Sequence, residues 1–364
     1  GGLIVINDTV KLVAKPGQVV ENLRNFTLGF PFRYGFDLEY VYAYPTSKPN
    51  SPLTVELDTG LGKIGFYGVN VIFPSGGVNI GNGEEYEFTV VFVFSNRISL
   101  QASAEPEQTL FNATFPAYPS LTLSARTANL TISFPIGAKY TNSSFETQGV
   151  TFQNATKGSF QIFSYPQKSN LTEFINESAW FSFSASSDVF KIIEVKEVKR
   201  EIRLHDYGDI LISDSYRIIS RSGDLTQFRI RLPSGAHGVS ALDAMGQIPS
   251  DRLSIADNNV TLTFSPALSQ GREERFAVNY LLPWKDYVNA QAWNSFYVNL
   301  KLFENNEWII RKLTTTVTLP EGAMLLSQPQ SINLKSLERS AYYTTLTFAF
   351  SNATPFHNLT FDFA

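Results

Sequence analysis

The chain has 364 residues, no cysteine and a formal net charge of −4. Its length exceeds one ordinary domain and suits two, and the absence of any basic block argues against nucleic acid as a partner. No apolar run reaches the roughly 18 residues that a membrane helix needs. An aromatic share of 14%, with 30 Phe and 16 Tyr, favours strands over helices.

Alternation of apolar and polar residues predicts half-buried strands along most of the chain. It is clearest at residues 88–92, 130–134 and 228–232, each bounded by Gly, Pro, Asn or Ser. Helical signals are few: short helices are predicted at 172–180 and 334–341, and the segment 284–294 is ambiguous. The predicted fold class is therefore all-β.

A turn motif of the form Phe/Leu-Pro-x-Gly-Gly/Ala occurs four times, at residues 73–77, 134–138, 232–236 and 319–323. Proline cannot donate to a sheet ladder and glycine tolerates positive φ, so the motif predicts that a strand ends and turns there.

A second motif indicates that the chain contains two related halves. Residues 83–90 resemble residues 271–278, and the next Pro-x-Gly motif begins 51 and 48 residues later. We interpret this as two tandem β-sandwich-like domains that arose by internal duplication, with about thirty extra residues, the hairpin around Asn259, in the second copy. The alternative is that β proteins reuse the same turn chemistry. The polar stretch 184–188 predicts a boundary that divides residues 1–188 from 189–364.

Asparagine-x-Ser/Thr sequons are dense, and they predict a translocated, N-glycosylated surface. No signal peptide is visible at Gly1, which is expected to follow a removed one. Dense sequons without cysteine favour an archaeal cell surface over an animal secretory protein. Eight of the eleven sequons precede the predicted boundary; they lie at Asn7, Asn25, Asn112, Asn129, Asn142, Asn154, Asn170, Asn176, Asn259, Asn352 and Asn358.

No residue pattern predicts catalysis. The glycines of residues 60–65 match a dinucleotide-binding pattern, but a strand follows where a helix is required, so they predict a hairpin turn. The three histidines lie far apart and have no metal-ligand spacing. The paired glutamates at 84–85 and 273–274 point to opposite faces of a strand. We therefore expect no catalytic residue, cofactor or metal.

One aromatic segment is a candidate interaction surface. Trp284, Tyr287 and Trp293 lie among polar residues after a predicted strand. Amphipathic rings of this kind are typical of protein interfaces and of membrane surfaces. The alternative is that the rings cover the core of the second sandwich.

Residues 190–364 resemble the second lumenal domain of ribophorin I. The resemblance rests on an ordered series of motifs at residues 198–210, 228–233, 279–283, 317–323 and 349–352. It departs from the family where a His-Trp pair is common, since Asp206 and Tyr207 stand there, so no catalytic histidine is implied. The family's membrane helix is expected beyond Ala364.

The resemblance implies a non-catalytic subunit of an oligosaccharyltransferase, on the extracytoplasmic face of a membrane, at an archaeal cell surface or in the ER lumen. Its implied partners are the catalytic subunit and other membrane subunits, and its implied role is to stabilise the complex or to steer acceptor polypeptide.

Two alternatives from other classes remain open. A glycosylated structural protein, such as an S-layer or extracellular filament subunit, would assemble with itself through edge strands. A glycan-binding module would use the aromatics of residues 284–293.

Overall fold

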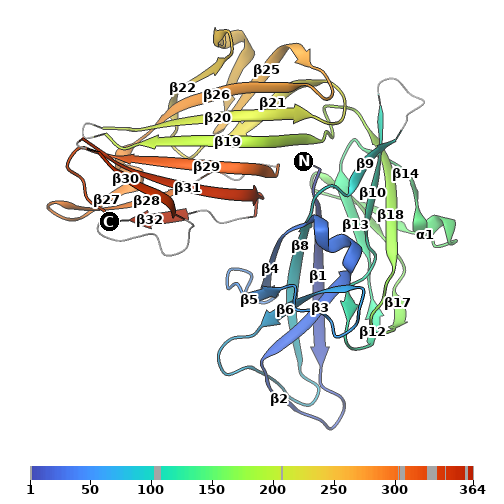
Figure 1. Cartoon of the computed structure of the whole chain (residues 1–364). Coiled ribbons are helices and arrows are strands. Elements are labelled where there is room, and N and C mark those ends of the chain that lie inside the picture. Colours follow the sequence, from blue (N-terminus) through green and yellow to red (C-terminus); the bar gives the residue numbers. More distant parts are fainter. Residues whose placement is uncertain are drawn as a thin grey trace. The chain divides into compact units, whose positions relative to one another are not determined.

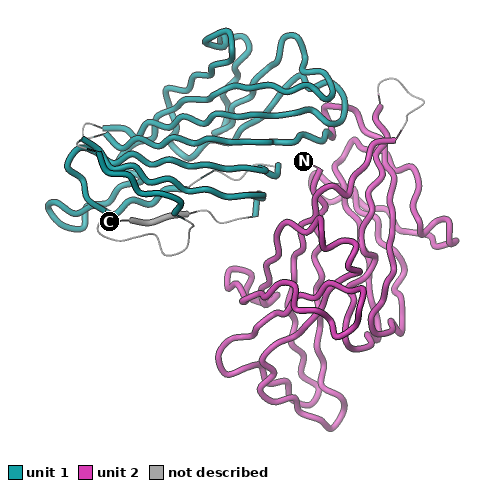
Figure 2. Tube along the Cα trace, viewed as in Figure 1, with its two compact units in different colours: residues 1, 191–364 teal, residues 2–190 magenta. Residues whose placement is uncertain are grey.

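The computed structural model describes residues 2–101, 108–205, 208–301, 303, 308–325, 334–340 and 342–356, and the backbone of 360–363. It is almost entirely β, as predicted. The chain divides into two compact units, Gly2–Phe190 and Lys191–Ala364 (Figures 1 and 2). No helix of the described residues is long and apolar enough to cross a membrane.

The N-terminal unit begins with a sandwich. One sheet has the order β1-β8-β4, and the sheet facing it has the order β11-β3-β6-β5. Alternate residues of both sheets meet in one core, in which Leu28, Val69, Val90 and Phe92 are at most 1% exposed. The bounds are β1 Ile4–Val13, β3 Asn25–Pro31, β4 Leu38–Pro45, β5 Thr54–Leu57, β6 Phe66–Ile72, β8 Glu85–Phe94 and β11 Ser120–Leu121. The 3-10 turn η1 (Phe32–Asp37) and the pair β2 (Val20–Leu23) and β7 (Val78–Ile80) complete this half.

The rest of the N-terminal unit is built on a four-stranded sheet in the order β14-β18-β10-β9 and two smaller sheets, β13-β16-β15 and β12-β17. Aromatic rings fill the space between them: Phe134, Phe163 and Phe181 lie with centroids 5.0–6.1 Å apart. The bounds are β9 Ile98–Gln101, β10 Thr109–Pro116, β12 Ala125–Ala128, β13 Thr131–Pro135, β14 Lys139–Ser143, α1 Ser144–Thr147, β15 Gln153–Lys157, β16 Phe160–Ser164, β17 Lys168–Leu171 and β18 Ser178–Ala185.

The C-terminal unit is dominated by an eight-stranded sheet in the order β23-β22-β26-β20-β19-β29-β31-β30. The sheets β21-β25-β24 and β27-β28-β32 accompany it, and the apolar side chains of all three sheets form one core. The bounds are β19 Ile193–Arg203, β20 Ile210–Ser220, β21 Leu225–Arg231, β22 His237–Asp243, β23 Gly246–Gln247, η2 Ser250–Arg252, β24 Leu253–Ala256, β25 Asn259–Leu268, β26 Glu273–Leu282, α2 Trp284–Tyr287, β27 Val288–Ala292, β28 Ser295–Lys301, β29 Ile310–Leu319, β30 Leu334–Arg339, β31 Thr344–Ala353 and β32 Thr360–Phe363.

The two units contain the same six-stranded arrangement. In the first, β1-β8-β4 faces β3-β6-β5; in the second, β20-β26-β22 faces β21-β25-β24. All these pairs are antiparallel. Counted in chain order within each unit, the sixth strand (β8 or β26) lies between the first (β1 or β20) and the third (β4 or β22). On the facing sheet, the fifth strand (β6 or β25) lies between the second (β3 or β21) and the fourth (β5 or β24). This shared order supports the predicted duplication.

The pairing registers show which residues correspond. Residue 4 pairs with 94 and residue 13 with 85, while residue 210 pairs with 282 and residue 219 with 273. The matched strands read Ile-Val-Ile-Asn-Asp-Thr-Val-Lys-Leu-Val and Ile-Leu-Ile-Ser-Asp-Ser-Tyr-Arg-Ile-Ile. Asp8 therefore corresponds to Asp214.

This correspondence corrects the alignment predicted from the turn motifs. The motif at 73–77 follows the fifth strand, β6, whereas the motif at 232–236 follows the second, β21. The hairpin around Asn259 joins β24 to β25 and matches the connection of β5 to β6, so it is no addition in the second copy. Of the repeated motifs, only those at residues 83–90 and 271–278, in which β8 and β26 begin, occupy equivalent places.

The turn chemistry itself is confirmed. In all four Pro-x-Gly motifs the proline carbonyl accepts a hydrogen bond from the residue three positions on, at 2.9–3.3 Å. The middle glycines have φ between 75° and 106°. The glycines at 60, 62 and 65 also have positive φ, and the strand β6 follows them, so these residues form a turn.

Both predicted helices are wrong. Residues 178–180 begin β18, and residues 334–339 form β30. β18 pairs with β10 and β14, and β30 pairs with β31. Neither segment is long enough to form a stable helix by itself. The ambiguous segment 284–294 is one helical turn, α2, followed by β27.

Candidate functional site

The described sequons differ in exposure between the two units. Asn7, Asn25, Asn129, Asn142, Asn154, Asn170 and Asn176 are exposed, and all belong to the N-terminal unit. The half-buried ones are Asn112, Asn259 and Asn352. Asn358 lies outside the described residues. A bulky glycan needs an exposed asparagine, so the described part of the C-terminal unit offers no fully exposed site.

All three half-buried asparagines are also engaged in side-chain hydrogen bonds. The Nδ2 atom of Asn259 donates to the Asp257 carbonyl at 3.0 Å. The Oδ1 atom of Asn112 accepts from Ser182 Oγ at 3.1 Å, between neighbouring strands. The Oδ1 atom of Asn352 accepts from Arg311 Nη1 at 3.4 Å. A glycan on Asn112 or Asn352 would be attached to Nδ2 of the same amide, so it would have to extend past these neighbouring side chains.

The aromatic segment is divided between core and surface. Trp284 and Tyr287 are half-buried against the C-terminal core, and the Tyr287 hydroxyl donates to the Ser234 carbonyl at 2.7 Å. Trp293 is 93% exposed, in the turn between β27 and β28, where Ala292 pairs with Ser295. The core interpretation therefore fits the first two rings, and only Trp293 is fully available to a partner.

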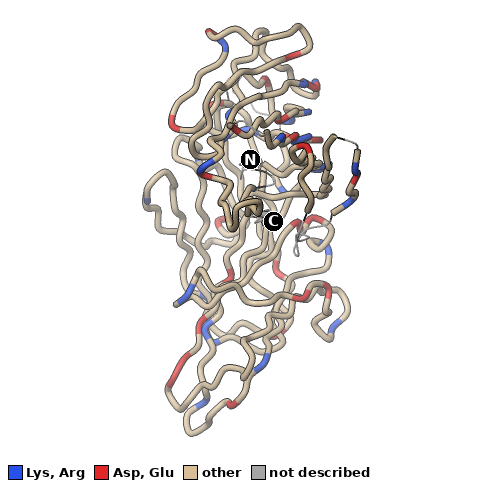
Figure 3. The backbone as a smooth tube through the Cα atoms, turned by 90° about the vertical axis from the view of Figure 1, so that its left-hand side faces the viewer, with Lys and Arg blue, Asp and Glu red and all other residues tan. Residues whose placement is uncertain are grey.

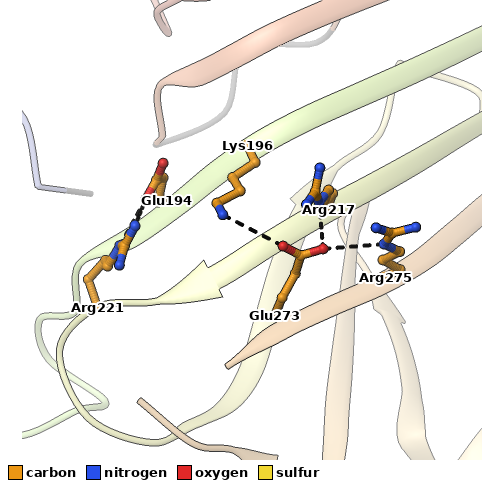
Figure 4. A network of polar contacts seen from close by, with 6 residues as sticks. All are labelled: Glu194, Lys196, Arg217, Arg221, Glu273 and Arg275. Atoms are coloured by element: carbon orange, nitrogen blue, oxygen red, sulfur yellow. Dashed lines mark hydrogen bonds and ion pairs between the residues drawn. The ribbon is translucent and has the colours of Figure 1, made fainter. Parts of the chain in front are cut away.

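The outer face of the eight-stranded sheet carries a network of ion pairs (Figure 4). Glu273 on β26 accepts from Arg217 on β20 at 2.5 Å and lies 3.3 Å from Arg275 and 3.7 Å from Lys196. The hydrogen bond from Arg217 is the main cause that lowers the pKa of Glu273 to about 2. A carboxylate held this firmly in its ionised form cannot act as a general acid or base near neutral pH.

Two further ion pairs lie on this face of the sheet, beside the network around Glu273. Lys312 on β29 lies 2.9 Å from Glu197 on β19, and this contact lowers the pKa of the Glu197 carboxyl. Arg221 donates to Glu194 at 2.8 Å through Nε. Each exposed pair contributes little stability, but together they fix long side chains on a rigid sheet. Figure 3 shows acidic and basic residues intermixed along the chain.

An open depression of about 400 Å³ lies on this face. Its lining includes Lys199, Ser215, Arg217, Asp243 and Ala277, which come from β19, β20, β22 and β26. An open hollow on the surface of a sheet suits contact with a protein surface better than binding of an enclosed small molecule.

The opposite side of the sheet buries a charged cluster. Arg200 and Asp214 face each other on β19 and β20, with Nε and Oδ1 3.4 Å apart, and their side chains are 1% and 4% exposed. Tyr280 links them: Arg200 Nη2 donates to its hydroxyl at 2.5 Å, and the hydroxyl donates to Asp214 Oδ2 at 2.9 Å. Burial raises the pKa of Tyr280 well above its usual value, so the hydroxyl keeps its proton. A buried pair of charges needs such added hydrogen bonds to offset its desolvation.

The remaining polar candidates do not assemble into a reactive site. The described residues hold no group of three or more His, Asp or Glu side chains suited to a metal ion. His237 contacts the Gly235 carbonyl at 3.2 Å and Asp209 at 2.8 Å; these contacts raise its pKa. His205 is exposed, and Asp206, Tyr207 and His357 lie outside the described residues.

Sequence reasoning missed the buried cluster. The signal that could have revealed it is the match between residues 4–13 and 210–219, which places an aspartate at the fifth position of both strands. A charged residue among alternating apolar ones, repeated in both halves, indicates an inward-pointing carboxylate.

A family model described as Ribophorin I matches residues 219–353, which run from β20 to the last residue of β31. Subunit 1B of the dolichyl-diphosphooligosaccharide–protein glycosyltransferase of Arabidopsis thaliana is 25% identical over 199 residues; the match covers 46% of this chain and 43% of that protein. The chain thus spans less than half the length of this curated relative. The predicted resemblance to ribophorin I is confirmed.

Among solved structures, an M1 zinc metallopeptidase of Deinococcus radiodurans matches with a TM-score of 0.35 and 14% identity, over 48% of this chain and 42% of that chain. A putative protease of Parabacteroides distasonis matches with a TM-score of 0.28 and 10% identity, over 47% and 39%. Likenesses this weak carry no argument about activity.

Proposed function

We propose that this ribophorin I-like chain is a non-catalytic, extracytoplasmic subunit of an oligosaccharyltransferase. The observation that carries the proposal is the family match over residues 219–353, together with a relative whose name places it in that glycosyltransferase. The match falls in the C-terminal unit and includes most of its eight-stranded sheet.

The chemistry of the described residues supports a non-catalytic role. Glu273 and Glu197 on the outer face are paired with cations, and the buried carboxylate Asp214 is held by Arg200 and Tyr280. No nucleophile lies beside a base in these contacts. The transfer reaction itself is assigned to another subunit.

We assign the contact with the other subunits to the outer face of the eight-stranded sheet. This face carries charged side chains that are held in place by ion pairs across neighbouring strands. It also lies in the unit that has no fully exposed sequon among the described residues, so glycans would not screen it. Its role would be to stabilise the assembled complex.

A charge exchange tests this assignment. Lys199→Glu combined with Glu201→Lys exchanges the charges of two exposed β19 residues and leaves the net charge unchanged. We expect weaker co-purification with the catalytic subunit and unchanged folding. The matched control is Lys168→Glu with Glu177→Lys, which exchanges a partly exposed ion pair of the N-terminal unit and should leave co-purification intact.

Two outcomes would contradict the proposal. If the β19 exchange co-purifies as well as the unchanged chain, another surface makes the contact. If the unchanged chain fails to associate with a catalytic membrane subunit and forms self-assembled fibres in electron micrographs, it is a structural filament protein.

A further inference from the structure

The two related sandwiches differ at one edge. In the C-terminal unit, β20 has a strand on each side, β26 and β19. In the N-terminal unit, the equivalent strand β1 pairs with β8, and no other strand of the described residues pairs with it. Among the described strands, none takes the place in the first sandwich that β19 occupies in the second.

The missing strand leaves the inward side chains of β1 half-covered. On β20 the inward residues Ile210, Ile212, Asp214, Tyr216 and Ile218 are all buried, none more than 3% exposed. At the corresponding positions of β1, Val10 is buried, but Ile4, Ile6, Asp8 and Leu12 are only half-buried. A strand added beside β1 would complete the sandwich as β19 does.

Asp8 shows what such a strand must carry. Its counterpart Asp214 faces Arg200 of β19 directly across the strand pair and forms an ion pair with it. Within the described part of the chain, the side chain of Asp8 has no hydrogen-bond or ion-pair partner. Burial alone raises the pKa of its carboxyl to about 7, the response of a carboxylate that lacks a cation.

The edge is also able to pair. β1 is ten residues long, contains no proline, and pairs with β8 without a register shift. Its exposed sequon residue Asn7 projects from the outer face of the strand, and not along the edge at which a new strand would form hydrogen bonds. Proline and bulges are among the devices that blunt exposed edges, and β1 has neither. An inward-pointing charge is another such device, so Asp8 discourages neutral segments while it favours a basic one.

We propose that the free edge of β1 binds an extended segment of a partner protein, which adds a strand beside β1 and places an arginine or lysine against Asp8. Backbone hydrogen bonds would supply affinity, and the basic side chain would supply selectivity. A second copy of this chain fits less well, because antiparallel pairing of two β1 strands centred at Asp8 brings two carboxylates together.

A peptide with the sequence of residues 195–203 serves as the probe, since this segment of β19 occupies the equivalent place in the C-terminal unit. Its matched control replaces the arginine at position 200 with methionine. Fluorescence anisotropy measures binding to the full chain, and hydrogen exchange locates it. We expect slower exchange of β1 amides with the arginine peptide, and about ten-fold weaker binding of the methionine peptide.

Substitution in the chain separates the charge contact from general edge pairing. In the Asp8→Asn chain the two peptides should bind equally, because the carboxylate that distinguishes them is gone. Asp251→Asn, which removes an exposed carboxylate of the C-terminal unit, should preserve the difference.

Three results would overturn the proposal. The first is equal binding of both peptides to the unchanged chain. The second is exchange protection that falls outside β1. The third is concentration-dependent self-association that protects the β1 amides, which would make a second copy of the chain the occupant. The peptide comparison needs no variant of the chain, so it stands even if Asp8→Asn folds poorly.

Discussion

The hydroxyl of Tyr280 lies between Arg200 and Asp214 and donates to Asp214 Oδ2 at 2.9 Å inside the C-terminal core. The corresponding residue of the N-terminal sandwich is Phe92, which is buried among apolar neighbours. The two sandwiches therefore share a fold and differ in how each accommodates its aspartate: the second surrounds it with partners, and the first leaves it at an open edge.

Tyr280→Phe removes a hydrogen bond from a buried carboxylate and keeps the ring. We expect the C-terminal unit to lose about 1–3 kcal/mol of stability, because the desolvated oxygen is not given a new partner. Urea unfolding monitored by hydrogen exchange of the β20 amides measures the loss. Tyr342→Phe, at a residue 66% exposed, is the control and should stay within about 0.5 kcal/mol of the unchanged chain. Equal stability of both variants would show that the hydroxyl is dispensable.

Glu273 should make the C-terminal unit sensitive to acid. Its folded pKa, about 2, lies below the ordinary value of 4.5, so its stabilising contribution is present above pH 4.5 and is lost as pH falls toward 2. Glu273→Gln should reduce this acid-dependent loss in a titration of stability between pH 5 and pH 2. Glu274→Gln, on the adjacent residue, is the control. A titration curve unchanged by Glu273→Gln would contradict the ion-pair assignment.

Ionisation of Asp8 should lower the stability of the N-terminal unit, whereas ionisation of Glu273 raises the stability of the C-terminal unit. The pKa of the Asp8 carboxyl is raised from 3.8 to about 7 in the folded chain, so between these values the unfolded chain releases a proton that the folded chain retains. Stability should therefore fall as pH rises through this range. Asp8→Asn should remove this fall in stability. The variant should therefore be more stable than the unchanged chain at pH 8, and the two stabilities should converge near pH 4. Hydrogen exchange of the β8 amides follows the unit, and parallel curves for the two chains would refute this.

The aromatic segment should separate folding from association. Trp284→Ala removes a half-buried ring and should destabilise the C-terminal unit by about 1–3 kcal/mol. Trp293→Ala removes an exposed ring and should leave stability unchanged. If the turn of β27 and β28 contacts a partner, Trp293→Ala should weaken co-purification by about 2 kcal/mol or more. A pull-down that is identical for the Trp293→Ala variant would limit the segment to a structural role.

Glycan occupancy should follow exposure. We expect modification at the exposed asparagines of the N-terminal unit, such as Asn154 and Asn170, and little at Asn112, whose side chain accepts a bond from Ser182. Asn352 should also be poorly occupied, because it is half-buried and Pro355 follows its sequon. Mass spectrometry of the native protein measures each site. Full occupancy at Asn112 together with empty exposed sites would contradict the exposure argument.

Much of the fold could be predicted because its signals are local. Alternation identified the strands, and Pro-x-Gly identified where they end, since both depend on residues that are neighbours in sequence. The helix prediction at 334–341 failed because β30 is held by its pairing with β31, a contact that composition does not encode. The motif alignment failed for a related reason: similar turns, such as those at 73–77 and 232–236, can follow different strands.

The sequence by itself determined an all-β chain, the repeated strand motif of its two halves, the positions of its sequons, and the resemblance to ribophorin I. Only the tertiary structure decided that Trp284 packs on the core while Trp293 is exposed. It also decided that Arg200 and Tyr280 reach the Asp214 carboxylate, while no described side chain makes such a contact with the Asp8 carboxyl. The physical reason is that a carboxylate's partners come from strands distant in the chain: Tyr280 lies 66 residues from Asp214. Which strand stands beside which is settled by the packing of whole sheets, and not by any local pattern.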